Sequence, residues 1–348
     1  MSTRRATGRT RLDEEIESQP DAWTAAFDAL ARAAQHGLPD PADFEEVLFI
    51  GCGSTHYLSQ WAAATCRAWN GGPAVAAPAS ELLMSPSAWT RRSPMLVVAT
   101  SRSARTTETV RAVDAFRRHG EGQVVVVTCA PEEELSGRAD VVLACPEALE
   151  ATVPQTRSFT SMLLLLAGLV SGPPRDNVVE ALAAEGRGLL SAYPSGLASA
   201  DRASSAYTFL GTGPRYGLAC EAMLKVKEMA LAPAEAFQTL EFRHGPISTV
   251  DPHSVVVGLL PGGDAGLERA VLDQVRQLGG ATVAIGPGAS SDEHDRHAEI
   301  AFDPALPQPW RDALYLPVLQ RTAVAAAAQR GVDPEEPPHL QPVVILEE

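Results

Sequence analysis

The sequence predicts an α/β protein made of two similar halves, each with a parallel sheet covered by helices. Short apolar runs alternate along the chain with longer amphipathic ones, as in parallel strands joined by helices. The apolar runs form two sets of four at nearly constant spacing. Both sets open alike, with FIGCG at residues 49–53 and FLGTG at residues 209–213. These observations indicate a duplicated unit.

The apolar runs give the expected strands. Those of the first half are residues 46–51, 95–100, 124–128 and 141–145, and those of the second are 207–211, 254–260, 281–286 and 298–302. Glycine and proline interrupt the pattern at SGPPR, residues 171–175, where we expect the halves to meet. The expected organisation is an N-terminal segment (1–30), a first domain (31–172) and a second domain (173–348).

Composition narrows the class of protein. The chain has 348 residues, 45% of them hydrophobic, and a net charge of −15. This charge argues against nucleic-acid binding, which needs a basic face. The longest apolar run, residues 162–170, is too short to span a bilayer, and the N-terminus lacks the apolar run of a signal peptide. The five cysteines show no paired metal-binding spacing. We therefore expect a cytoplasmic protein that binds neither membrane nor metal.

A group of hydroxyls follows the second expected strand, in SRSARTTET at residues 101–109. Ligands of open α/β sheets bind beyond the carboxyl ends of the strands. Hydroxyls, arginines and free helix amides at that place suit a phosphate monoester. A second pair, Ser54 and Thr55, ends the first strand. The alternative is an ordinary helix cap with a solvated turn, and the residues alone leave both interpretations open.

The Gly-x-Gly turns are weak evidence for a cofactor. After Gly51 and Gly53, His56 stands where a dinucleotide-binding fingerprint needs glycine, and no Gly-Lys-Ser/Thr follows as in a phosphate-binding P-loop. Nicotinamide cofactors and ATP are therefore unsupported, and we expect no cofactor.

The stretch EAMLKVKE, residues 221–228, holds the only two lysines of the chain. On a helix, Glu221, Lys225 and Glu228 share one face, whereas Lys227 falls on another. A lysine between two carboxylates can hold one ionised while it orients the other, which suits a base that moves a proton beside a carbonyl or imine. The alternative is a surface ion-pair ladder.

Several long motifs occur together in a fixed order. They are EIESQP (15–20), GCGST (51–55), ASE (79–81), SRS (101–103) with Thr106, VPQTRSFT (153–160), the Glu221, Lys225 and Glu228 set, and EFRHGP (241–246). Through them, nearly the whole chain resembles the tandem sugar-isomerase (SIS) domains of the isomerase half of glucosamine-6-phosphate synthase and of related phosphosugar deaminases and deglycases. The resemblance implies two flavodoxin-like three-layer sandwiches.

The resemblance also implies roles for particular residues. Those expected to bind a hexose 6-phosphate or an amino-sugar phosphate are Gly53, Ser54, Thr55, Ser101, Arg102, Ser103, Thr106, Val153, Gln155 and Glu221. Val153 and Gln155 would line the sugar. Glu228 would be the proton-transfer carboxylate, assisted by Lys225. His244 would be the acid/base that opens the ring, and in the family it comes from the neighbouring subunit, which implies a homodimer with shared active sites.

Three departures limit what is carried over. The chain begins where the isomerase half begins, so we expect no glutaminase activity. Ala104 and Arg105 replace the usual Gly-Glu, and Arg105 adds a positive charge that favours a more anionic substrate. In the synthase a C-terminal lysine forms a Schiff base with the ketose phosphate, but the corresponding residue here is Pro342, in HLQP.

Because proline cannot form an imine, a synthase mechanism is not expected. The first expectation is an enzyme that isomerises and cleaves the C–N bond of an amino-substituted hexose 6-phosphate, like a fructosamine-6-phosphate deglycase or a glucosamine-6-phosphate deaminase. One alternative is a plain aldose–ketose phosphosugar isomerase. Another is a non-catalytic phosphosugar-binding protein, against which the pairing of Glu228 with His244 argues. The amine, the sugar epimer and the direction of the reaction stay open.

Overall fold

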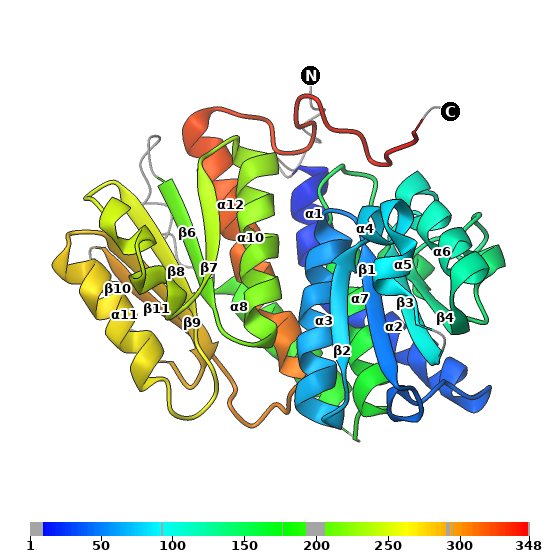
Figure 1. Cartoon of the computed structure of the whole chain (residues 1–348). Coiled ribbons are helices and arrows are strands. Elements are labelled where there is room, and N and C mark those ends of the chain that lie inside the picture. The colour runs from blue at the N-terminus through cyan, green and yellow to red at the C-terminus, as the bar shows by residue number, and fades with distance from the viewer. Residues whose placement is uncertain are drawn as a thin grey trace. The chain divides into compact units, whose positions relative to one another are not determined.

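The computed structural model of the protein describes residues 10–91, 93–175, 177–192, 206–289, 293–294 and 296–346 (Figure 1). The chain splits into two compact units. Unit 1 contains Met1–Glu17, Thr152–Pro154 and Ala184–Leu340, and unit 2 contains Ser18–Ala151, Gln155–Ala183 and Gln341–Glu348. Helix α8 (Val178–Ser191) is divided between them. The limits at residues 30 and 172 stay a prediction.

Unit 2 is built on a parallel sheet that has five strands among the described residues. The strands are β1 (Glu46–Gly51), β2 (Ala74–Pro78), β3 (Pro94–Ser101), β4 (Glu121–Thr128) and β5 (Val141–Ala144), in the order β2-β1-β3-β4-β5. The central strands are buried on both faces, which their runs of valine, leucine and isoleucine allow.

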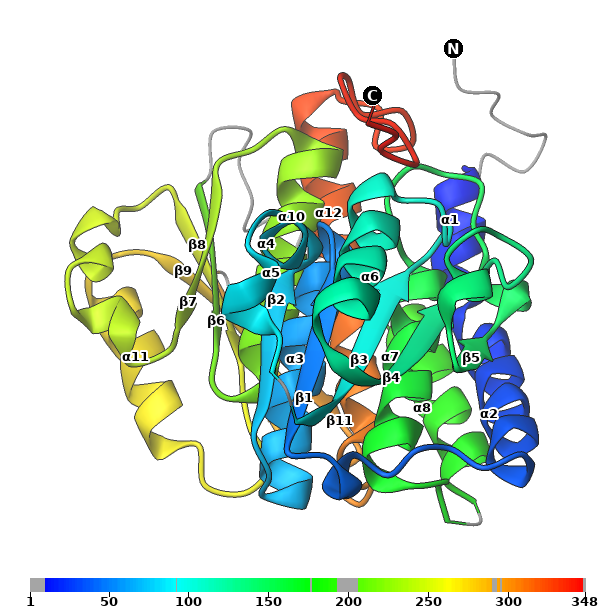
Figure 2. The ribbon, with the colours of Figure 1, turned by 45° about the vertical axis from the view of Figure 1, so that its right-hand side comes forward.

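Helices cover both faces of this sheet (Figure 2). The helices on one face are α2 (Gln19–Gln35), α3 (Ser54–Asn70) and α7 (Arg157–Ser171), and those on the other are α4 (Ala79–Met84), α5 (Pro86–Trp89) and α6 (Thr107–His119). Helix α6 buries Val113 and Phe116 against Val97 and Ala99 of β3. This packing fixes the start of α6 at the carboxyl end of β3.

Unit 1 repeats the plan. Its described strands are β6 (Ala206–Gly211), β7 (Ala234–Gln238), β8 (Ser254–Leu259), β9 (Ala281–Pro287), β10 (Glu293–His294) and β11 (His297–Phe302), in the order β10-β11-β9-β8-β6-β7. All pairs are parallel except β10 with β11. Helices α10 (Pro214–Ala230) and α12 (Tyr315–Arg330) pack together on one face, and α11 (Gly266–Gln277) lies on the other (Figure 1).

The remaining helices of the described chain are short. Helix α1 (Arg11–Glu17) belongs to unit 1 and contacts α12. The 3-10 helices are η1 (Pro41–Asp43), η2 (Ser136–Arg138), η3 (Pro146–Ala148), η4 (Glu241–Arg243), η5 (Pro246–Thr249) and η6 (Trp310–Leu314).

The two units share one topology, as the sequence predicts. Strand order β2-β1-β3-β4-β5 matches β7-β6-β8-β9-β11, and both have the flavodoxin-like pattern. The first strand of each leads into the same turn, because Gly53 has φ 56° and ψ −126° while Gly213 has φ 60° and ψ −130°. A side chain would strain this left-handed conformation, which accounts for glycine at both positions. The α/β fold with two tandem domains is confirmed.

All eight expected strands are present, with ends that differ by up to three residues. Strands β2 and β7 are not among the strands expected from the sequence. Their sequences, AVAAP and AEAFQ, are rich in alanine, glutamate and glutamine, which are weak strand formers. Each pairs with a single strand of its sheet, so neither carries the apolar run of a central strand.

Candidate functional site

The hydroxyl cluster lies where the sequence predicts, at the carboxyl end of β3 and the start of α6. Ser101 Oγ and Thr106 Oγ1 are 3.5 Å apart, and Ser103 Oγ accepts a hydrogen bond from Arg105 N. Between them Ala104 takes φ 50°, a left-handed conformation that turns the loop back on itself. The loop therefore gathers the three hydroxyls Ser101, Ser103 and Thr106 at a helix N-terminus, whose first amide, Thr107 N, donates to Val344 O.

The turn after β1 brings a second group to the same edge of the sheet. Thr55 Oγ1 accepts from Cys52 N and donates to Cys52 O, both at 2.9 Å, so this hydroxyl closes the turn. The Ser54 side chain makes no hydrogen bond within the described chain. Ser54 is thus available to a ligand, whereas Thr55 is already engaged. The phosphate contact expected of Thr55 stays a prediction.

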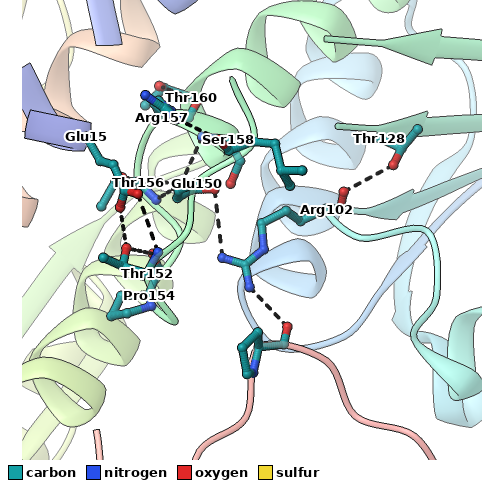
Figure 3. A network of polar contacts seen from close by, with 12 residues as sticks. Glu15, Arg102, Thr128, Glu150, Thr152, Pro154, Thr156, Arg157, Ser158 and Thr160 are labelled. Atoms are coloured by element: carbon teal, nitrogen blue, oxygen red, sulfur yellow. Dashed lines mark hydrogen bonds and ion pairs between the residues drawn. The ribbon is translucent and has the colours of Figure 1, made fainter. Parts of the chain in front are cut away.

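The side chain of Arg102 is buried, with 6% exposed. Its Nη1 lies 3.8 Å from Glu150 Oε2, and its Nη2 donates to the carbonyl oxygen of Pro342 at 3.0 Å. Its own carbonyl oxygen accepts from Thr128 Oγ1 and Cys129 N. Figure 3 shows the guanidinium turned toward Glu150. The expected contact of Arg102 with phosphate is untested, and the guanidinium is engaged within unit 2.

Glu150 is a site residue that the sequence analysis did not include. Its Oε1 accepts from the backbone amides of Thr156 and Ser158 at the start of α7, and from Thr156 Oγ1 (Figure 3). Its Oε2 is buried and makes no hydrogen bond within the described chain, and it faces Arg102. A carboxylate at a helix N-terminus is favourable. The sequence gives only a weak signal, a glutamate shortly before a long apolar helix.

Arg105 differs from Arg102 in its surroundings. Its side chain is 54% exposed and lies 3.8 Å from Glu133. This contact offsets the positive charge of Arg105, so the expected preference for a more anionic substrate stays a prediction.

The lysine of α10 is buried between two glutamates. Lys225 is 1% exposed, with its Nζ 2.5 Å from Glu228 Oε2 and 3.4 Å from Glu221 Oε1. Glu221 is equally buried, whereas the Glu228 side chain is 18% exposed. Lys227 is exposed, as expected for the other face. The surface ladder is therefore wrong for Glu221 and Lys225, because surface ion pairs do not bury their charges.

This arrangement leaves one oxygen of Glu228 free. Lys225 holds Oε2, whereas Oε1 makes no hydrogen bond within the described chain and the residue is partly exposed. A buried lysine is costly unless it is paired, and here both carboxylates offset that cost. The geometry suits a carboxylate that is fixed at one oxygen and can exchange a proton at the other.

The other expected residues lie in loops. His244 follows η4 and is exposed, and its side chain makes no hydrogen bond within the described chain. Gly245, with φ 123°, turns the chain directly after it. Val153, in unit 1, and Gln155, in unit 2, are half-buried. Gln155 Oε1 is buried with no hydrogen-bond partner in the described chain, which leaves it free for a ligand.

Cysteine chemistry is disfavoured. Burial raises the pKa of the Cys52 thiol, whose Sγ lies 3.5 Å from Thr109 Oγ1. Burial also raises the pKa of Cys145 and Cys220 to about 11. These thiols stay protonated at neutral pH and are poor nucleophiles. In the described residues no group of His, Cys, Asp or Glu could hold a metal ion. No helix of that part of the chain is long and apolar enough to cross a membrane.

Comparison with known families decides the membership of the chain. The family model described as the SIS domain matches residues 42–171 and 203–303, one segment in each half. The chain belongs to the SIS domain family. The resemblance seen in its motifs is confirmed at this level.

Two curated proteins illustrate the sequence similarity of this chain to known enzymes. The glutamine–fructose-6-phosphate aminotransferase of Pyrobaculum aerophilum is 29% identical over 265 residues, covering 72% of this chain and 44% of that protein. The aminotransferase of Gloeobacter violaceus is 27% identical over 329 residues, covering 88% of this chain and 52% of that protein. This chain spans about half the length of these curated relatives.

Two solved structures have the same fold over nearly the whole chain. A glucosamine-6-phosphate deaminase from Thermotoga maritima superposes with a TM-score of 0.80 at 24% identity, over 97% of this chain and 100% of that one. A tagatose-6-phosphate ketose/aldose isomerase from Escherichia coli gives 0.81 at 21% identity, over 99% and 98%. At these identities the likeness establishes the fold alone.

Proposed function

We propose that this SIS protein isomerises and cleaves the C–N bond of an amino-substituted hexose 6-phosphate, as a fructosamine-6-phosphate deglycase or a glucosamine-6-phosphate deaminase does. The observation that carries the proposal is Lys225, buried between Glu221 and Glu228 with one oxygen of Glu228 left free. A sensor that only binds phosphosugars needs no such carboxylate. Names of related proteins add support, because they include an aminotransferase and a deaminase of hexose 6-phosphates.

The phosphate is assigned to unit 2. Ser101, Ser103 and Thr106 supply hydroxyl donors beside the first turn of α6, and Ser54 supplies another at the start of α3. Such donors, with the partial positive charge of a helix N-terminus, bind phosphate without a metal ion. Gln155 Oε1, which lacks a partner in the described chain, accepts from a sugar hydroxyl.

The chemistry is assigned to Glu228. In the open-chain amino sugar, Glu228 takes the proton from the carbon at one side of the C1–C2 bond and returns it to the other. For glucosamine 6-phosphate this turns the aldehyde and amine into a ketose imine. Water then adds to the imine carbon, the C–N bond breaks, and the amine leaves with the proton that the water gives up. In this scheme the substrate supplies the imine nitrogen, so Pro342 in place of a lysine is no obstacle.

His244 is assigned to ring opening. It is exposed, on a loop after β7, and the proposal places it in the site of a second copy of the chain. A two-fold dimer then forms two composite sites. A cytoplasmic location belongs to the same proposal.

A substrate panel tests the assignment. Purified protein is incubated with glucosamine 6-phosphate, amine adducts of fructose 6-phosphate and plain hexose 6-phosphates, and mass spectrometry records released amine and isomerised sugar. We expect amine release from at least one adduct, abolished in Glu228→Gln and kept in Glu235→Gln, an exposed glutamate on β7. Isomerisation of plain sugars without amine release would favour the aldose–ketose isomerase. Binding without turnover would favour the sensor.

A further inference from the structure

The C-terminal tail (Gln341–Leu346), itself part of unit 2, contacts the loop of residues 101–107 between β3 and α6. Its carbonyl groups accept hydrogen bonds from Arg102 Nη2 at Pro342 and from Thr107 N at Val344, at 3.0 and 3.3 Å. Leu346 N donates to Thr107 Oγ1 at 3.1 Å. We propose that Arg102 is a positioning residue, which anchors this tail against the first turn of α6, and that its side chain is not a phosphate ligand.

Burial alone does not hold the tail. The side chains of Val344, Ile345 and Leu346 are 49%, 56% and 41% exposed. Apolar stabilisation scales with the area removed from water, so half-exposed side chains contribute little. The position of the tail therefore depends on its three hydrogen bonds, of which only that of Arg102 carries a charge.

Arg102 is itself held in place from the other side. Glu150 Oε2 faces its Nη1, while Glu150 Oε1 binds the amides of Thr156 and Ser158 at the start of α7. The planar guanidinium of Arg102 thus links the Glu150 carboxylate to the Pro342 carbonyl. A lysine ammonium is a single point charge and does not reproduce this link. The contacts run from α7 through Glu150 and Arg102 to Pro342, all within unit 2.

The tail completes α6. The N-cap residue Thr106 makes no side-chain cap hydrogen bond, and the first amide of the helix, Thr107 N, is capped by Val344 O instead. The anchor at Pro342 sets where Val344 lies, two residues along. Arg102 therefore acts on the loop of residues 101–107 through the tail, by hydrogen bonds within this chain.

Hydrogen exchange of the tail tests the anchor. In Arg102→Gln and Arg102→Lys, we expect the amides of Leu346 and Thr107, which the tail contacts protect, to exchange about 10- to 100-fold faster than in the unchanged protein, the fold-change for losing a charge-assisted hydrogen bond. Arg105→Gln is the matched control, because it removes the same charge three residues away from a side chain that pairs with Glu133. Its tail should exchange at the unchanged rate. Equal tail exchange in all four proteins would overturn the proposal.

A buried glutamate without its partner can unfold the protein, so a second variant is needed. Arg102→Gln combined with Glu150→Gln removes both charges, and the Glu150→Gln side chain keeps an oxygen for the amides of α7. In this double variant we expect fast exchange in the tail and unchanged exchange at the start of α7. Equal acceleration in both segments would mean that Arg102 is part of the core and not a tail anchor.

Phosphate affinity separates an anchor from a ligand, and this step rests on the proposed function. We expect the Arg102→Gln, Glu150→Gln double variant to bind inorganic phosphate within about threefold of the unchanged protein, whereas loss of a direct charged contact costs about tenfold or more. A loss of that size with an unchanged tail would make Arg102 a ligand and refute the anchor. If the unchanged protein binds no phosphosugar, the proposed function fails, while tail exchange still decides the anchor.

Discussion

Replacing Lys225 by methionine should destabilise unit 1 strongly. With an effective dielectric constant of about 20, the contacts of Nζ at 2.5 and 3.4 Å are each worth about 5–7 kcal/mol before desolvation. The cost of burying the ammonium offsets much of this. Breaking a buried ion pair on one side typically costs about 3–5 kcal/mol, which we expect as the loss in the free energy of unfolding for Lys225→Met.

Denaturation in urea, followed by circular dichroism, measures this loss. Lys227→Met is the matched control on the same helix, and because Lys227 is exposed its change should stay within about 0.5 kcal/mol. Adding Glu221→Gln to Lys225→Met should restore part of the stability, because an uncharged amide then replaces one of the two carboxylates that have lost their partner. A cost of under about 1 kcal/mol for Lys225→Met would refute the account of this cluster.

Three further predictions concern the site. Replacing Ser103 and Thr106 by alanine should weaken binding of a 6-phosphosugar by about 1–3 kcal/mol, and unchanged affinity in calorimetry would remove the phosphate assignment. Borohydride with fructose 6-phosphate should trap no covalent adduct, because Pro342 cannot form an imine and Lys225 is buried and paired; an adduct mapped to Lys225 by mass spectrometry would contradict this. Mixing inactive Glu228→Ala and His244→Ala proteins should restore roughly a quarter of the activity if sites are shared across a dimer, since about half the dimers are mixed and each has one good site. A refolded mixed dimer without activity would place both residues in one chain.

The central strands could be predicted because their signal is local. Runs such as the four valines at 124–127 are buried on both faces of a sheet, and their own sequence predicts a strand without knowledge of the strands they pair with. The strands β2 and β7 could not, because their pairing comes from the neighbouring strand and not from their own alanine-rich sequences.

The same division holds for the site. Glu221, Lys225 and Glu228 are neighbours on one helix, so spacing alone brings them together. The partners of Arg102 are distant in sequence, since Pro342 follows it by 240 residues. No periodicity encodes such a contact, and an arginine beside three hydroxyls looks like a phosphate ligand. Only the fold reveals that Glu150 and the tail take up its guanidinium.

Solvent deuterium incorporation tests the role of Glu228 most directly. A 6-phosphosugar that turns over is incubated in D₂O, and proton NMR follows the hydrogens at C1 and C2. If Glu228 moves the proton, the unchanged protein should incorporate deuterium at one of these carbons. Glu228→Gln should do so at least about 100-fold more slowly, while it still binds the sugar in calorimetry. Incorporation at the unchanged rate in Glu228→Gln would show that another group moves the proton.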